Sequence, residues 1–304
     1  MRTVLVLGGT GLTGRRLVNV LLQEGFLVRC AVRNLDAARA RLPAAAELVR
    51  GDIADRASIE EAVRGCEAVF NCVHTLSPQK GAAPGETFAD TEVRGLENVV
   101  AACRLHGVRR VLYVTFLGIT PDTRSIWARG RWKAEQMLLG SGLDVTILRP
   151  GQIVGRGGFG FDTTLANARR RVALILGSGR NRMQNIALDD LVHYLVRSLD
   201  EPRTFGRAFD VGGDEAFTTD EMVDVAARVL GRRPPRKLHL LPWLLAPFAG
   251  LFERLAGLPR GAFADLLLGV DADLVGDVGP IRAIIPLTPM PYAQAVERAL
   301  AADA

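Results

Sequence analysis

The chain has 304 residues, of which 48% are hydrophobic, and its 38 basic and 33 acidic residues give a net charge of +5. This length and composition can bury a sizeable core, which excludes a disordered protein. The basic residues are scattered, without the motif of a nucleic-acid-binding protein, so we expect a small-molecule ligand and no nucleic-acid partner.

The N-terminus and the cysteines predict the compartment. Arg2 leads directly into a short apolar run that ends at a glycine, far short of a secretory signal or a membrane span. Cys30, Cys66, Cys72 and Cys103 lack the spacing of metal ligands or of a redox pair. We therefore expect buried free thiols, no metal site and no transmembrane segment in a cytoplasmic protein.

Short apolar segments alternate with segments of helical periodicity through the first half of the chain. The segments typical of strands buried on both faces are 3–8, 27–32, 46–51, 67–73, 110–115 and 144–150. Helical periodicity covers 11–24, 35–41, 55–64, 86–106 and 126–140. This alternation implies right-handed crossovers and an α/β fold with a Rossmann-type, doubly wound parallel sheet.

The pattern changes after Pro150. It predicts helices at 162–171, 189–199 and 218–230, strands at 172–177 and 206–211, and an apolar, proline-interrupted and helical last third. The expected organisation is a dinucleotide-binding domain at 1–155 and a smaller, mainly helical substrate or partner lobe at 156–304. We expect this C-terminal lobe to be partly interleaved with the sheet.

The first predicted strand ends at Gly8, and Gly11 and Gly14 follow at spacings of three residues in the run GGTGLTG at residues 8–14. Their spacing predicts a tight exit from the strand at Gly8, close approach of a pyrophosphate at Gly11, and close packing of the next helix at Gly14. The free amides at the start of that helix then meet the phosphates, with Thr10 and Leu12 in the same loop. The sequence therefore predicts a dinucleotide site.

Side chains near the ends of the second and third predicted strands are candidates for contact with the adenosine part of the dinucleotide. The second strand ends at Arg33, where NAD binders usually carry an acid for the ribose hydroxyls, and a guanidinium there suits a 2′-phosphate. Arg15 or Arg16 can add to it, so NADP(H) is favoured over NAD(H), with a solvated surface arginine as the alternative. Asp52, after the third strand, is placed either to accept a hydrogen bond from adenine or simply to begin the next helix.

These residues resemble the short-chain dehydrogenase/reductase superfamily. The likeness is closer to its atypical branch of NAD(P)-binding proteins, which includes NmrA-like regulators and the nucleotide-binding accessory subunit of respiratory complex I. The matching motifs are GGTGLTG, GD at 51–52, KAE at 133–135, ILRPGQIVG at 147–155 and Asp189–Asp190 preceded by NIA. The resemblance implies cofactor contacts from Ile53, Val73 and His74, and from the backbone of Pro150 to Ile153 beside the nicotinamide carboxamide.

Active members of that superfamily carry a Tyr-x-x-x-Lys pair, in which the tyrosine transfers the proton and the lysine holds the nicotinamide ribose. Lys133 matches the lysine, but Arg129 stands in the place of the tyrosine. Thr115 matches the family's serine, and His74 is a candidate for the missing acid, although a strand-end threonine and a loop histidine are also ordinary. Lys133 itself is a ribose ligand, a proton donor or a solvated helix lysine.

The first class of function is an NADPH-dependent oxidoreductase acting on a hydrophobic quinoid or conjugated carbonyl substrate. The product anion of such a substrate is delocalised, so the cations Arg129, Arg131 and Lys133 can stabilise it without a tyrosine. In that case the aromatic and aliphatic residues of the last third either cover the substrate or pack within the lobe. The residues in question are Trp243, Phe248, Leu251 and Phe252.

The second class is a non-catalytic NAD(P)-binding regulatory or accessory protein, which the missing tyrosine also predicts. The apolar segment 240–258 would then contact a protein or membrane partner as an interfacial helix, although its prolines and sparse charge disfavour direct insertion into a membrane. We favour the oxidoreductase, and the oligomeric state stays open.

Overall fold

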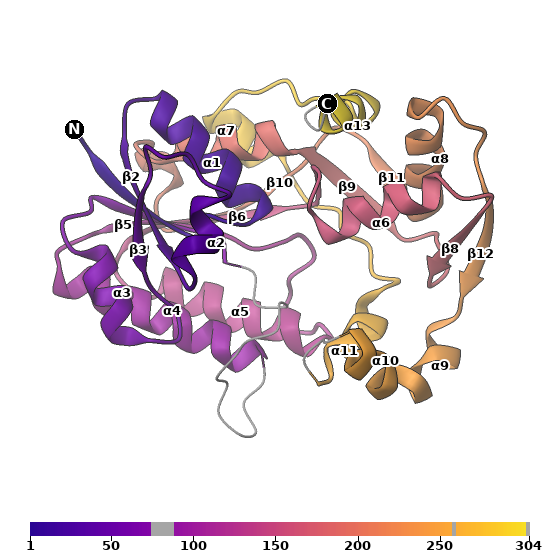
Figure 1. Cartoon of the computed structure of the whole chain (residues 1–304), viewed down its shortest axis with the longest axis horizontal. Helices are drawn as coiled ribbons and strands as arrows, with labels where there is room; N and C mark the ends of the chain where they lie inside the picture. Colours follow the sequence, from indigo (N-terminus) through magenta and orange to yellow (C-terminus); the bar gives the residue numbers. More distant parts are fainter. Residues whose placement is uncertain (74–87, 257–259, 302–304) are drawn as a thin grey trace.

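The computed structural model describes residues 1–73, 88–256 and 260–301 of the chain. At its centre is a seven-stranded sheet in which every neighbouring pair of strands is parallel (Figure 1). In spatial order the strands are β10 (Arg207–Val211), β6 (Asp144–Pro150), β5 (Arg110–Val114), β4 (Ala68–Asn71), β1 (Thr3–Leu7), β2 (Leu27–Val32) and β3 (Glu47–Arg50). The predicted Rossmann-type parallel sheet is confirmed.

Helices cover both faces of this sheet (Figure 1), because successive side chains of a strand point to opposite faces. Val4 and Val6 of β1 join one apolar cluster, and Leu5 and Leu7 join the other. This burial on two sides explains the unbroken apolar runs in the sequence. The first cluster includes α1 (Leu12–Gln23) and α7 (Leu188–Ser198), and the second includes α3 (Arg56–Val63), α4 (Phe88–Leu105) and α5 (Ile126–Leu139). The short α2 (Leu35–Arg39) follows β2.

Two small sheets lie beyond the main one. The first joins β7 (Gln152–Val154), β9 (Arg182–Ala187) and β11 (Ala216–Thr218), and the second joins β8 (Val172–Leu176) and β12 (Arg236–Leu240). Of these strands, the sequence pattern predicted only β8. A third apolar cluster combines residues of the helices α6 (Phe159–Ala168), α8 (Thr219–Val229) and α13 (Tyr292–Ala301) with residues of these strands. The remaining helices are α9 (Pro242–Leu245), α10 (Ala249–Ala256), α11 (Ala262–Gly269) and α12 (Gly279–Ile284), with 3-10 turns η1 (Pro202–Thr204) and η2 (Ala246–Phe248).

The second half of the chain contributes to the main sheet as well as to the smaller ones. Strand β10 lies beside β6 at one edge of the main sheet, and α7 packs against α1. Elements from 156–304 therefore complete the layers that residues 1–155 begin. The domain boundary at residue 155 itself stays a prediction.

Two sequence features can be followed in the described part of the chain. No helix there has both the length and the apolar character needed to cross a bilayer. All four cysteines are free thiols, and Cys30, Cys66 and Cys103 are buried whereas Cys72 is half-buried. Burial raises the pKa of the Cys30 and Cys103 thiols to about 12, so both are held protonated at neutral pH.

Candidate functional site

The glycine turn joins β1 to α1 with little space around its backbone. Gly8 has a φ of +77°, and a Cβ there would lie 2.6 Å from the carbonyl oxygen of Cys72 on the neighbouring chain segment. A Cβ on Gly14 would lie 2.2 Å from the Gly8 carbonyl oxygen and 2.7 Å from Gly9 Cα. The predicted tight exit at Gly8 and close helix packing at Gly14 therefore have a direct steric basis.

The start of α1 is open to a ligand. Gly11 is the N-cap residue, and its amide donates to the Gly8 carbonyl oxygen at 3.0 Å. It has no side chain to accept hydrogen bonds from the first helical amides. An exposed helix N-terminus of this kind suits an anion such as a pyrophosphate. Thr10 lies half-buried in the same turn.

The loop after β7 lies against this helix start. A Cβ on Gly155 or Gly158 would lie 3.0 Å or 2.8 Å from the Leu12 side chain, so Leu12 packs tightly against this loop. Arg15 reaches the same loop, because a Cβ on Gly157 would lie 3.4 Å from an Arg15 guanidinium nitrogen. The Nε of Arg15 is buried and has no hydrogen-bond partner within the part of the chain that the structure describes.

Arg16, the other predicted phosphate contact, is already engaged. Its Nε lies 2.6 Å from the Asp189 carboxylate, which Arg298 also contacts at 2.6 Å. Asp189 belongs to the pair that the sequence resemblance singled out, and its described contacts tie α7 to α1 and α13. Arg15 is therefore the better placed of the two arginines for an anion.

The residues predicted around adenine lie after β2 and β3. Arg33 directly follows β2 and is exposed. The Asp52 carboxylate accepts the Ala54 amide at 3.0 Å in the turn before α3. The alternative that Asp52 begins this helix is wrong, because the N-cap of α3 is Asp55. Ile53 is buried against α4, where a Cβ on Gly95 would lie 2.6 Å from its side chain.

The carboxyl ends of β4 and β5 meet a buried ion pair that the sequence did not predict. Arg131 of α5 and Glu92 of α4 are both buried and lie 3.1 Å apart, and Tyr113 donates to the same carboxylate at 2.5 Å. Arg131 also donates to the carbonyl oxygens of Val114, at 3.0 Å, and of Val73, at 3.3 Å. Its charge is therefore committed to Glu92, and the expectation that Arg131 joins a free positive site is wrong.

A second buried carboxylate binds the predicted catalytic threonine. The Thr115 hydroxyl donates to Glu135 at 2.7 Å, and Glu135 is fully buried. Arg149 of β6 donates to the same carboxylate through Nε at 3.0 Å. The Thr115 hydroxyl hydrogen therefore points toward Glu135 in this structure.

Lys133 and Arg129 lie on the exposed face of α5, one helical turn apart. Arg129 donates to the carbonyl oxygens of Thr123 and Arg124, at 3.0 Å and 2.9 Å, so it closes the loop before the helix. Lys133 is exposed, and within the described ranges it makes no ion pair or hydrogen bond. Its ammonium group can therefore meet a ligand.

The remaining predicted contacts lie at strand ends. Val73 is half-buried after β4, and its amide donates to the Asn71 side chain at 3.0 Å. Pro150 ends β6, and its carbonyl oxygen accepts the Leu117 amide at 2.9 Å. Ile153 is half-buried in β7, opposite Ile186 of β9. His74 lies outside the residues that the structure describes.

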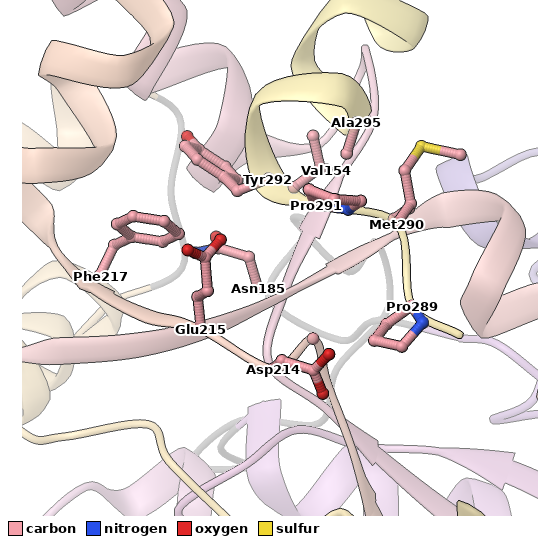
Figure 2. A pocket seen from close by; sticks show the side chains of 12 residues that line it. Val154, Asn185, Asp214, Glu215, Phe217, Pro289, Met290, Pro291, Tyr292 and Ala295 are labelled. Atoms are coloured by element: carbon pink, nitrogen blue, oxygen red, sulfur yellow. The ribbon is translucent and has the colours of Figure 1, made fainter. Parts of the chain in front are cut away.

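A separate cavity of about 190 Å³ lies in the small three-stranded sheet, and no predicted site residue lines it. Figure 2 shows Phe217 and Tyr292 on one side of it and Pro289 and Met290 on the other. Because it is lined by β7, β9, β11 and the start of α13, it is distinct from the glycine turn.

Comparison with models of protein families shows to which family the chain belongs. A family model described as NAD(P)H-binding matches residues 8–202, from the first glycine of the turn to the end of α7 and the residues just after it. The chain belongs to this NAD(P)H-binding family. The match spans well over half of the chain and confirms the resemblance drawn from GGTGLTG and the motifs after it.

Two curated relatives of this NAD(P)H-binding protein have different names and roles. The 40 kDa subunit of NADH-ubiquinone oxidoreductase from Neurospora crassa mitochondria is 24% identical and is matched over 91% of this chain and 75% of its own. A 2-alkyl-3-oxoalkanoate reductase from Stenotrophomonas maltophilia is 27% identical over 75% of this chain and 76% of its own. The first is a subunit of a larger oxidoreductase, and the second is a reductase.

Solved structures confirm the fold of the NAD(P)H-binding protein. An NADPH-dependent quinone oxidoreductase of Escherichia coli, complexed with NADPH, superposes with a TM-score of 0.74 at 19% identity and covers 98% of this chain and 99% of that one. A dTDP-glucose 4,6-dehydratase of Bacillus anthracis, in complex with NAD, has a TM-score of 0.76 at 16% identity, covering 99% and 96%.

Sequence reasoning missed Glu92, Glu135 and Arg149. A weak signal was present for Arg149, a charged residue that directly follows the apolar pair Ile147–Leu148 near the end of strand 144–150. Such a residue needs a partner when it is buried. The helical periodicity around Glu92 and Glu135 does not reveal that partner, because it does not say which strand each helix faces.

Proposed function

We propose that this protein is an NADPH-dependent oxidoreductase acting on a hydrophobic quinoid or conjugated carbonyl substrate. The observation that carries the proposal is the exposed Lys133, which has no ion pair or hydrogen bond among the described residues and lies on a helix whose opposite face is anchored by Arg131 and Glu135. The names of the oxoalkanoate reductase and the quinone oxidoreductase described above support the same reaction class.

The chain supplies binding and charge rather than a dedicated proton donor. The amides at the start of α1 and the Arg15 guanidinium bind the pyrophosphate, and Lys133 holds the nicotinamide ribose. When bound, reduced nicotinamide supplies a hydride. Adding a hydride to a quinoid acceptor gives a delocalised anion, and that anion takes a proton from water. Lys133 stabilises the anion electrostatically, so Arg129 in the tyrosine position does not prevent the reaction.

The experiment is stopped-flow absorbance at 340 nm with NADPH and a panel of quinones, enones and aromatic ketones, on wild type and on Lys133→Met. We expect one acceptor class to oxidise NADPH. Because the ammonium contacts the cofactor, we expect the variant to bind NADPH about tenfold more weakly and to turn over more slowly. Gln136→Ala, on an exposed position of the same helix, is the matched control and should behave as wild type.

Two outcomes would contradict the proposal. Unchanged NADPH affinity and turnover in Lys133→Met would remove Lys133 from the site. Tight NADPH binding without oxidation by any acceptor would favour the regulatory or accessory function. That second function is supported by Arg129 closing a loop and by Thr115 donating to Glu135, and it is the role of the complex I relatives.

The preference for NADP(H) is tested separately at Arg33. A guanidinium at the end of β2 recognises a 2′-phosphate through charge-assisted hydrogen bonds, and reversal of its charge repels that phosphate. Arg33→Asp should therefore weaken NADPH binding at least about tenfold and leave NADH binding unchanged, as measured by fluorescence titration of both cofactors. Arg41→Asp, at another exposed position of the same region, controls for net charge. An unchanged NADPH/NADH affinity ratio would refute the assignment.

A further inference from the structure

An apolar stripe lies on the surface of the segment from α9 to α10. We define the apolar stripe as Trp243, Leu244, Phe248, Leu251, Phe252 and Leu255, whose exposed fractions run from 47% for Phe252 to 79% for Leu255. The positions 244, 248, 251, 252 and 255 follow helical spacing and share one side of the helical segment. A helix of a globular protein normally buries such a stripe, so its exposure calls for something that covers it.

The polar contacts of this segment hold the stripe outward. Glu253 is a residue of α10, and its side chain is buried. Its carboxylate accepts hydrogen bonds from the amides of Gly261 at 2.8 Å, Phe263 at 2.9 Å and Ala264 at 3.2 Å. The carboxylate therefore caps the N-terminus of α11. Turning the apolar stripe inward would expose these amides and leave the helix start uncapped.

The next contact ties the segment to the main body. Asp265 of α11 is buried, accepts the Ser125 hydroxyl at 2.7 Å and accepts the Ile126 amide at 2.5 Å, so it caps the start of α5. In Figure 1, α9, α10 and α11 stand together at the edge of the molecule, away from the main sheet. The apolar stripe is thus presented by an anchored arm.

The exposed charges between Pro242 and Ala262 are all positive. From Pro242 to Ala262 the charged residues are Glu253, Arg254 and Arg260. Glu253 is buried, whereas both arginines are exposed and make no ion pair within the described ranges. An apolar face with cations beside it and an exposed tryptophan is complementary to an anionic lipid surface, where aromatic and aliphatic side chains enter the headgroup boundary and arginines meet phosphates.

We propose that the apolar stripe docks this protein on the surface of an anionic lipid bilayer, without spanning it. The prolines that argued against this segment at the level of sequence are accommodated, because Pro242 and Pro247 stand in the first turn of α9 and of η2. Docking does not depend on the reductase activity, although it would bring the protein to the phase in which a hydrophobic quinoid substrate dissolves.

The test is flotation of the full-length protein, without NADPH, on vesicles of phosphatidylcholine mixed equally with phosphatidylglycerol and on vesicles of phosphatidylcholine alone. We expect wild type to float with the anionic vesicles. Leu244→Ser/Leu255→Ser should weaken that binding at least about tenfold, because each buried leucine contributes roughly a tenfold or greater factor. Arg254→Glu/Arg260→Glu should lose the preference for anionic vesicles.

The matched control is Leu105→Ser, which removes a leucine of 61% exposure at the end of α4. It should float as wild type does, and all variants should keep the wild-type melting temperature, which separates docking from folding. Failure of wild type to float, or flotation of the double leucine variant equal to wild type, would overturn the proposal. If wild type does not float but forms a dimer without lipid, and Leu244→Ser/Leu255→Ser is a monomer, the apolar stripe binds a second copy of the chain instead.

Discussion

Gly14→Ala is expected to remove high-affinity NADPH binding and to lower the melting temperature. The added Cβ would lie 2.2 Å from the Gly8 carbonyl oxygen, and backbone rather than a flexible side chain blocks it. Either α1 moves away from the sheet or the turn that we propose as the pyrophosphate site opens, and overpacking of this kind costs about 1–3 kcal/mol. Because the amides of α1 and of the turn act together, we expect NADPH affinity to fall at least about tenfold in calorimetric titration.

The matched control for Gly14→Ala is Gly269→Ala. Gly269 ends α11, and a Cβ there would meet nothing within 4 Å. This variant should bind NADPH as wild type does. If Gly14→Ala binds NADPH with wild-type affinity, the close packing of α1 on the turn is not required for the proposed phosphate binding by the backbone amides.

Arg131→Met is expected to cost about 3–5 kcal/mol in the free energy of unfolding, measured by urea denaturation. The guanidinium is buried between the Glu92 carboxylate and two strand-end carbonyl oxygens, and its carbon lies 4.8 Å from the centre of the Trp127 ring. Methionine fills much of the volume but removes the cation that Arg131 places 3.1 Å from the buried Glu92 carboxylate. Burial also raises the pKa of Tyr113, so its phenol stays a donor to Glu92 but does not neutralise it.

Two further variants separate the lost ion pair from lost packing. Arg129→Met, on the exposed face of the same helix, should cost much less than Arg131→Met, because its two hydrogen bonds to the loop carbonyls are solvent-exposed and no buried charge loses its partner. Arg131→Met/Glu92→Gln should recover much of the loss, because the uncompensated charge is gone. Equal stability losses in the single and double variants would mean that packing, and not the ion pair, dominates at this position.

The sequence by itself determined the main sheet and the glycine turn, because both are encoded locally. A strand buried on two faces is mostly apolar, with little alternation of polar residues, as in β1 and β5, and this pattern can be seen without knowing which strands are its neighbours. The close approach of Gly14 to the Gly8 carbonyl oxygen is likewise local, because the two residues are only six positions apart in the chain. The shared face of Arg129 and Lys133 follows from their spacing of four residues.

Only the tertiary structure decided which charges are free. Arg131 and Lys133 are two residues apart on α5, and periodicity does not say which of them faces the sheet. The pairing of Arg131 with Glu92 depends on how α4 and α5 pack over β5. Such contacts join segments far apart in sequence, and the topology of the fold sets them rather than local preference.

The same reason explains the missed strands and the apolar stripe. The sequence of strand β9 looks polar because it contains Gln184 and Asn185, although both residues are buried in the fold. The Gln184 side chain donates to the Gly213 carbonyl oxygen and accepts the Gly276 amide, and both partners lie outside the strand. The apolar pattern of segment 240–258 is compatible with a substrate cover, with packing inside the lobe and with an interfacial helix, and it does not choose among them. The helix caps supplied by Glu253 and Asp265 hold the apolar face of this segment outward. The hydrophobic pattern shows only which residues are able to be buried, whereas these long-range polar contacts determine which residues are buried in the fold.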